Sequence, residues 1–121
     1  MGATGLSGTP AEYRRRLIEQ SDEQLDAWAA EAMRDISIRR GVLAVLHDVR
    51  EASGMDDRGL EKVYAAGGGP PAVVGRDGTG RLMVPAATVH CLVRGIRAIV
   101  PGSREVLVDF LVANFEELVY A

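Results

Sequence analysis

The stretch GGGPPAVVGRDGTGRLMVP, residues 67–85, is the one long segment of this chain whose pattern is not helical. Within it, two short runs prone to β structure flank the dipeptide Asp77-Gly78. Such a dipeptide is typical of a β-hairpin, because both residues of a tight turn need a positive φ that Asp and Gly tolerate. The sequence therefore predicts one β-hairpin near residues 72–84, with Asp77 and Gly78 as a two-residue turn.

A hairpin closed by that turn has two distinct faces, because successive side chains of a strand point to opposite sides. The alternation places three side chains on one face: Val73, Leu82 and Val84. It places four on the other face: Val74, Arg76, Arg81 and Met83. The second face is therefore expected to combine apolar and basic side chains.

The segments on both sides of the hairpin have the apolar periodicity of helices. Thr9 and Ser21 each begin a capping box, in which a Ser or Thr caps a helix and a Glu or Gln follows three residues later. We expect Trp28 to anchor the second helix in the core, and a break in the helical pattern at residues 36–38. Together these signals predict a mainly α-helical protein: a compact orthogonal bundle of five or six helices with one inserted β-hairpin.

Length and composition indicate one domain. Residues 1–8 are small and glycine-rich, so they are expected to form a flexible N-terminus, and residues 9–121 form a single helical domain with its hairpin. The final helix, beginning near Ser103, is apolar over most of its circumference. A helix of that kind is either the central core element or half of a subunit interface. We therefore predict a homodimer with the last helix or the hairpin at its interface.

Charge and cysteine content narrow the possible environment and partners. The net charge of −3 gives no general reason to expect a nucleic acid or an acidic membrane as partner. The single cysteine, Cys91, excludes an intramolecular disulfide and suits a reducing compartment. No signal-peptide pattern and no apolar run of membrane-spanning length is present. These features favour a cytoplasmic bacterial protein without a membrane partner.

No catalytic, metal or cofactor motif is found in the sequence. The only nitrogen and sulfur ligands are His47, His90 and Cys91, and the adjacent pair His90 and Cys91 diverges by roughly 100° on a helix. The triple glycine at residues 67–69 is followed by two prolines and lacks the Lys-Ser/Thr of a phosphate-binding loop. We therefore expect a non-enzymatic protein that carries no cofactor.

A winged helix-turn-helix is one alternative, in which residues 42–53 and 57–66 form the motif and the hairpin forms the wing. The pattern would bury three side chains: Val49, Leu60 and Val63. Against this interpretation, the helix that would enter the groove mixes acids with bases and is not suited to contact phosphates; its exposed residues would be Asp57, Arg58, Gly59, Glu61 and Lys62. DNA is therefore a disfavoured partner.

A small-anion site is the second alternative. Residues 76–104 contain five arginines and one acid, whereas residues 105–121 contain four acids and no base. The candidate anion-binding residues are Arg76, Arg81, His90, Arg94 and Arg97. Guanidinium groups converging from two elements suit a carboxylate or phosphate. The competing interpretation is that these bases pair with the acids of the last helix, either within the fold or across a dimer.

The function that these observations favour is that of a small cytoplasmic binding or regulatory protein. It would act through protein–protein contacts and self-associate as a homodimer, with a protein partner that the sequence does not identify.

Overall fold

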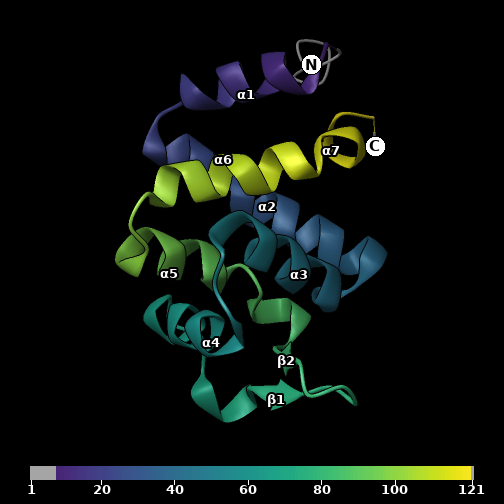
Figure 1. Cartoon of the computed structure of the whole chain (residues 1–121), viewed down its shortest axis with the longest axis vertical. Coiled ribbons are helices and arrows are strands. Elements are labelled where there is room, and N and C mark those ends of the chain that lie inside the picture. The colour runs from purple at the N-terminus through teal and green to yellow at the C-terminus, as the bar shows by residue number, and fades with distance from the viewer. Residues whose placement is uncertain (1–7, 121) are drawn as a thin grey trace.

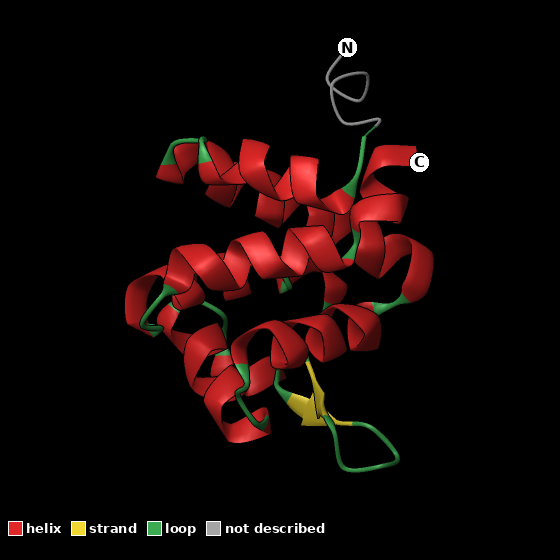
Figure 2. Cartoon of the chain, turned by 45° about the horizontal axis from the view of Figure 1, so that its top comes forward, coloured by secondary structure: helices red, strands yellow, loops and turns green. Residues whose placement is uncertain are grey.

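The computed structural model describes residues 8–120, and the side chains of residues 8–118. Of the predicted flexible N-terminus, residues 1–7 lie outside the described part of the chain. The prediction of a mainly helical bundle with one inserted β-hairpin is confirmed (Figures 1 and 2). The helices are α1 (Pro10–Ile18), α2 (Asp22–Arg40), α3 (Val42–Ser53), α4 (Asp57–Ala66), α5 (Cys91–Ile99), α6 (Ser103–Ala113) and α7 (Phe115–Tyr120).

Local capping sets most of these helix ends. The Thr9 hydroxyl accepts a hydrogen bond from the Glu12 N–H at 3.2 Å, which caps α1, and the Ser21 hydroxyl caps α2 in the same way. Gly54 ends α3 with a φ of 72°, the left-handed conformation that glycine adopts without strain. Helix α4 begins at its Asp56 cap, and α3 ends at Gly54, where the sequence predicted. Helix α3 begins only at Val42, after Gly41, without a side-chain cap.

Two predictions about α2 were wrong. The helix is not broken at residues 36–38 but continues to Arg40, where Gly41 ends it with a φ of 94°. Ser37 is tolerated within the helix because its hydroxyl donates to the Arg34 carbonyl at 2.8 Å. Trp28 is not a core anchor: it lies on the outer side of α2 and is 37% exposed.

Helix α6 is the central core element. It packs against α1, α2, α3 and α5, and it contributes five buried apolar side chains: Val106, Leu107, Val108, Phe110 and Leu111. Figure 1 shows α6 next to α1, with α3 and α5 on its other side and α7 beyond its C-terminal end. The predicted last helix is divided at Asn114 into α6 and α7, which gives seven α-helices in the described residues instead of five or six.

Two glycines allow α4 and α5 to cross in direct backbone contact. A Cβ atom at Gly95 of α5 would lie 1.7 Å from the Val63 carbonyl oxygen of α4. A Cβ atom at Gly67 would lie 1.8 Å from the Cys91 carbonyl oxygen. Only hydrogen atoms fit at these two positions, so the crossing fixes α4 on α5 and thereby places the hairpin that follows α4.

The hairpin consists of β1 (Gly75–Arg76) and β2 (Leu82–Met83), paired antiparallel with Gly75 opposite Met83 and Arg76 opposite Leu82 (Figure 2). The 3-10 helix η2 (Pro71–Val73) precedes β1, and the 3-10 helix η3 (Ala86–Thr88) follows β2. Leu82 and Val84 are buried, as their shared face predicted, but Val73 lies in η2 and is 45% exposed. The three side chains therefore do not share one face.

The predicted two-residue turn at Asp77-Gly78 was also wrong. The Asp77 N–H donates to the Arg81 carbonyl at 2.9 Å, so residues 78–80 form the loop, and its positive φ belongs to Gly80. The Asp77 carboxylate Oδ1 accepts three hydrogen bonds, from the Thr79 N–H and hydroxyl and from the Arg81 N–H. A carboxylate that satisfies three donors stabilises this longer loop.

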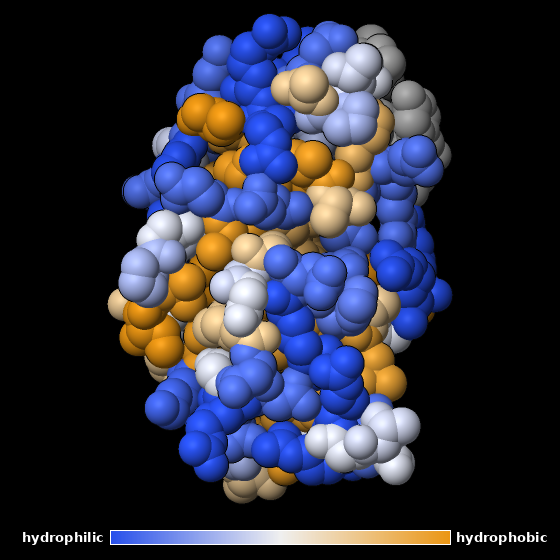
Figure 3. Space-filling view, viewed as in Figure 1, coloured by the Kyte–Doolittle hydropathy of each residue, from blue (hydrophilic) through white to orange (hydrophobic). Residues whose placement is uncertain are grey.

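The surface has no single broad apolar face in the view of Figure 3, where hydrophobic side chains form several patches separated by hydrophilic ones. Within the described residues, none of the helices combines the length and the hydropathy that a transmembrane span needs.

Candidate functional site

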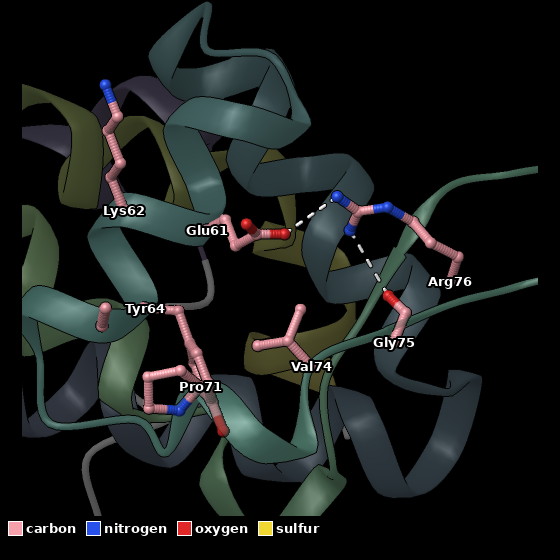
Figure 4. A pocket seen from close by; sticks show the side chains of 8 residues that line it. Glu61, Lys62, Tyr64, Pro71, Val74, Gly75 and Arg76 are labelled. Carbon is pink, nitrogen blue, oxygen red and sulfur yellow. Dashed lines mark hydrogen bonds and ion pairs between the residues drawn. The ribbon is translucent and has the colours of Figure 1, made fainter.

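A hollow of about 460 Å³ lies between α4 and the chain that enters the hairpin. We call it the α4 hollow. Its lining residues are Glu61, Lys62, Tyr64, Ala65, Pro71, Val74, Gly75 and Arg76 (Figure 4). Its volume falls within the range of roughly 300–1,000 Å³ that is usual for ligand sites in proteins.

The floor of the α4 hollow is held in place by Tyr64. This side chain is fully buried, and its hydroxyl shares a hydrogen bond of 2.9 Å with the Thr88 hydroxyl of η3. Gly69 lies against the ring, because a Cβ atom there would be 2.4 Å from Cζ of Tyr64. Gly68, with a φ of 91°, turns the chain so that the following prolines pass over the ring. The hollow is thus a fixed feature of the fold and needs no rearrangement to form.

An ion pair crosses the rim of the α4 hollow. Arg76 Nη2 of β1 donates to Glu61 Oε1 of α4 at 2.8 Å, and both side chains are exposed by more than two fifths (Figure 4). An exposed pair of this kind contributes at most about 1 kcal/mol to stability, so its partners can be exchanged at small cost. Figure 4 shows Lys62 extending away from this pair.

An exposed apolar ledge borders the hollow. Residues 70–73 are two prolines, an alanine and a valine, and all four are exposed. A run of consecutive exposed apolar residues is unusual in a protein surface unless it serves an interaction. The two prolines restrict the backbone, so the ledge is rigid before it contacts anything.

The predicted anion-binding residues are distributed over two elements and make different contacts. Arg76 binds Glu61 at the hairpin, whereas Arg97 of α5 binds Asp26 of α2 at 2.6 Å and also donates to the Ser103 hydroxyl. The hydrogen bonds that Arg97 donates to Asp26, together with the negative charges of Asp26 and Asp22, outweigh desolvation and raise the pKa of Arg97 above its usual value. Arg97 is therefore already neutralised within the fold.

The other three members of the set have no ion-pair partner in the described part of the chain. The side chains of Arg81 and Arg94 are exposed, and His90 is half-buried at the start of α5, with a buried Nδ1 that has no hydrogen-bond partner. No hydrogen bond or ion pair between described residues joins any two of the five. Anion binding by this set stays a prediction.

Within the described residues of one copy, these bases do not pair with the acids of the last helix, so that form of the competing interpretation was wrong; pairing across a dimer stays a prediction. Arg97 and Arg104 bind acids of α2, with Asp22 lying 2.5 Å from Arg104, and Arg76 binds an acid of α4. The acids near the C-terminus bind arginines of the first two helices instead: Asp109 lies 2.7 Å from Arg14, and Glu117 lies 3.2 Å from Arg40. Charge blocks along the sequence did not reveal these partners.

The carboxylate of Asp57 connects α4 to two other elements, a contact that the sequence did not reveal. Its carboxylate accepts a hydrogen bond of 2.5 Å from Arg50 Nε at the end of α3, and one of 3.0 Å from the Leu82 N–H of β2. Burial raises the pKa of the Asp57 carboxyl, but the hydrogen bonds from Leu82 and Arg50 and the charges of Arg50 and Arg81 outweigh it and hold the pKa below its usual range. One carboxylate therefore connects α3, α4 and the hairpin.

The winged-helix interpretation receives mixed support from the arrangement of these elements. The helix bounds are those it needs, and Val49, Leu60 and Val63 are all fully buried. However, α4 packs chiefly on α5, whereas α3 packs on α2 and α6. The two helices of the motif thus have different main neighbours.

Neither a search for metal-binding clusters nor comparison with known proteins points to another candidate site. Within the described residues, no group of three or more His, Cys, Asp or Glu side chains is placed to hold a metal ion, and Cys91 is a buried free thiol. Comparison of the chain with protein-family models, curated proteins and solved structures gave no match.

Proposed function

We propose that this protein is a non-enzymatic cytoplasmic binding or regulatory protein that acts through protein–protein contacts and forms a homodimer. The observation that carries the proposal is the juxtaposition of the α4 hollow with the exposed apolar ledge of residues 70–73. A concave apolar site beside a convex apolar segment on one surface is self-complementary. Two copies related by a twofold axis can each insert the ledge of one into the hollow of the other.

Val73 is the side chain best suited to that insertion. It is the largest apolar side chain of the ledge, it is 45% exposed, and its backbone is held in η2 by the hydrogen bond that the Val73 N–H donates to the Pro70 carbonyl at 3.2 Å. A preordered segment loses little conformational entropy on binding. Burial of two such side chains, one from each copy, places the apolar contact at the centre of the interface.

The Glu61–Arg76 ion pair supplies a polar rim for the same interface. Because both side chains are largely exposed, they can exchange partners across the twofold axis and keep the same number of charged contacts. The buried positions of α6, by contrast, are covered within one copy of the chain. The hairpin side of the molecule is therefore the interface that we propose, and not the last helix.

The test is the molar mass in solution, measured by light scattering or sedimentation over a series of protein concentrations. We expect a mass near twice the 13.0 kDa of one chain. Val73→Asp should shift the equilibrium to the monomer, because a carboxylate would be buried at the centre of the interface. The matched control is Ile38→Asp, which changes an apolar side chain of α2 that is 81% exposed and should leave the mass unchanged.

Two results would overturn the proposal. One is a mass of 13.0 kDa for the wild-type chain at every concentration. The other is a dimer that Val73→Asp does not weaken while the variant remains folded by circular dichroism.

A further inference from the structure

A second hollow, of about 490 Å³, lies between α1 and the N-terminal half of α2. We call it the Trp28 hollow. It lies at the end of the molecule away from the hairpin, where Figure 1 shows α1 as the outermost helix. Four of its lining residues carry the inference: Tyr13, Arg15 and Arg16 of α1, and Trp28 of α2.

The exposure of Trp28 is the first observation. The neighbouring apolar residues Leu25 and Ala29 of α2 are fully buried, whereas Trp28 is 37% exposed and borders the hollow. An exposed tryptophan leaves a large apolar ring in contact with water, and Trp, Tyr and Arg are the residues most enriched at the energetic centres of protein interfaces. The hollow is lined by all three types.

The two arginines are the second observation. Three consecutive arginines occur in α1, and the first of them, Arg14, binds Asp109 of α6 at 2.7 Å. Arg15 and Arg16 are exposed, and neither side chain has a hydrogen-bond or ion-pair partner in the described part of the chain. Each of these unpaired guanidinium groups can bind a carboxylate in a bidentate manner.

Tyr13 contributes an uncharged aromatic ring to the lining of the Trp28 hollow. It is almost fully buried, and its ring lies 5.5 Å from that of Phe115. Burial raises its pKa to about 12, so it carries no charge at neutral pH. Glu19 is the one acid that lines the hollow, so the balance of charge there is positive.

We propose that the Trp28 hollow is a docking site for an acidic peptide segment, in which an apolar side chain contacts Trp28 and neighbouring carboxylates bind Arg15 and Arg16. A nucleic acid fits less well. Helix α2 exposes Glu31 one helical turn beyond Trp28, and this acid would repel a continuous phosphate chain. A peptide can place its carboxylates beside the arginines alone.

The chain contains its own reporter for this site, because Trp28 is its only tryptophan. The experiment titrates the protein with a synthetic peptide in which glutamates flank a pair of leucines, capped at both ends and free of Trp and Tyr. We expect a saturable change in Trp28 fluorescence. The comparison probes are the same peptide with lysine in place of glutamate, and a short oligothymidylate.

Arg15→Gln combined with Arg16→Gln should weaken binding of the acidic peptide by ~10-fold or more, because two charge-assisted contacts are lost. The matched control is Arg34→Gln combined with Arg39→Gln, which removes the same charge from two exposed arginines of α2 that do not line the hollow. The control should bind within about twofold of the wild type, as expected for distant independent sites.

The proposal is overturned if the acidic peptide gives no saturable response, if the lysine peptide binds equally well, or if the Arg15 and Arg16 variant binds like the control. Tighter binding of oligothymidylate would identify a nucleic-acid surface instead. A fluorescence change with protein concentration alone would mean that a second copy occupies the hollow. The test is independent of the proposed homodimer, because Val73→Asp should bind the acidic peptide as the wild type does.

Discussion

Gly95→Ala tests the crossing of α4 and α5 that places the hairpin and the α4 hollow. The added methyl group would lie 1.7 Å from the Val63 carbonyl oxygen and 2.6 Å from its carbonyl carbon. An ordinary carbon–oxygen contact is about 3.3 Å or longer, so the two helices must separate by more than 1 Å or distort. Because the obstructing atoms belong to the backbone, no side-chain rotation can relieve the contact.

Two opposing effects set the size of the change. Replacing glycine by alanine within a helix would by itself stabilise the protein by about 1 kcal/mol. Forcing a methyl group into a packed contact costs ~3 kcal/mol, at the upper end of the usual range because the neighbour is backbone. We therefore expect a net loss of ~2 kcal/mol in the free energy of unfolding, which lowers the melting temperature by roughly 6–12 °C for a domain of this size.

The assay is chemical denaturation and calorimetry of Gly95→Ala beside Gly75→Ala. Gly75 has a negative φ and nothing within 4 Å of an added Cβ atom, so its substitution should change stability by less than about 0.5 kcal/mol. A Gly95→Ala protein that is as stable as the wild type would refute the close crossing. Greater stability would show that helix propensity dominates at this position.

Two further predictions concern the hairpin. Gly80→Val should lower the free energy of unfolding by ~2 kcal/mol in chemical denaturation, because Gly80 has a φ of 84° that a β-branched residue adopts only with strain. Gly78→Val changes a residue without positive φ and should lower it by less than about 0.5 kcal/mol. Equal losses for the two variants would contradict the loop geometry. Asp57→Asn should lose ~2 kcal/mol at pH 7, because it removes the charged acceptor for Arg50 and Leu82. The pKa of Asp57 is lower in the folded protein than in the unfolded chain, so its charge contributes fully to stability above the unfolded-state pKa of about 4. That contribution is lost as the pH falls through the folded-state pKa, so the stabilities of wild type and variant should converge in acid. A difference in stability that does not change with pH would show that the charge of the carboxylate does not stabilise the contact between α3, α4 and the hairpin.

The sequence by itself determined the elements whose signals are local. Helix α4 begins at its Asp56 cap, and α3 ends at Gly54, as the sequence predicted, because a cap acts within one helical turn of the residue that provides it. The hairpin lies where Gly and Pro interrupt the helical pattern, and Leu82 and Val84 are buried as their alternation predicted. Each of these features depends on residues only a few positions apart.

Local sequence signals gave wrong predictions where a side chain could form a different hydrogen bond nearby. The Asp-Gly dipeptide is equally compatible with a two-residue turn, but the Asp77 carboxylate accepts three hydrogen bonds only in the longer loop. The pattern predicts a break at residues 36–38, yet the Ser37 hydroxyl is satisfied within a continuous α2. In both places, hydrogen bonds made by one side chain to groups nearby in the sequence favour a backbone conformation other than the one that the pattern predicts.

The tertiary structure alone decided the candidate sites. Arg97 binds Asp26 across 71 positions of the chain, and no pattern of charge along the sequence identifies that partner. The α4 hollow exists because two glycines bring α4 onto α5, and the Trp28 hollow exists because α1 leaves one ring of α2 uncovered. Ion pairs and hollows depend on how whole helices pack, and packing is set by contacts between residues far apart in sequence, which periodicity and caps do not encode.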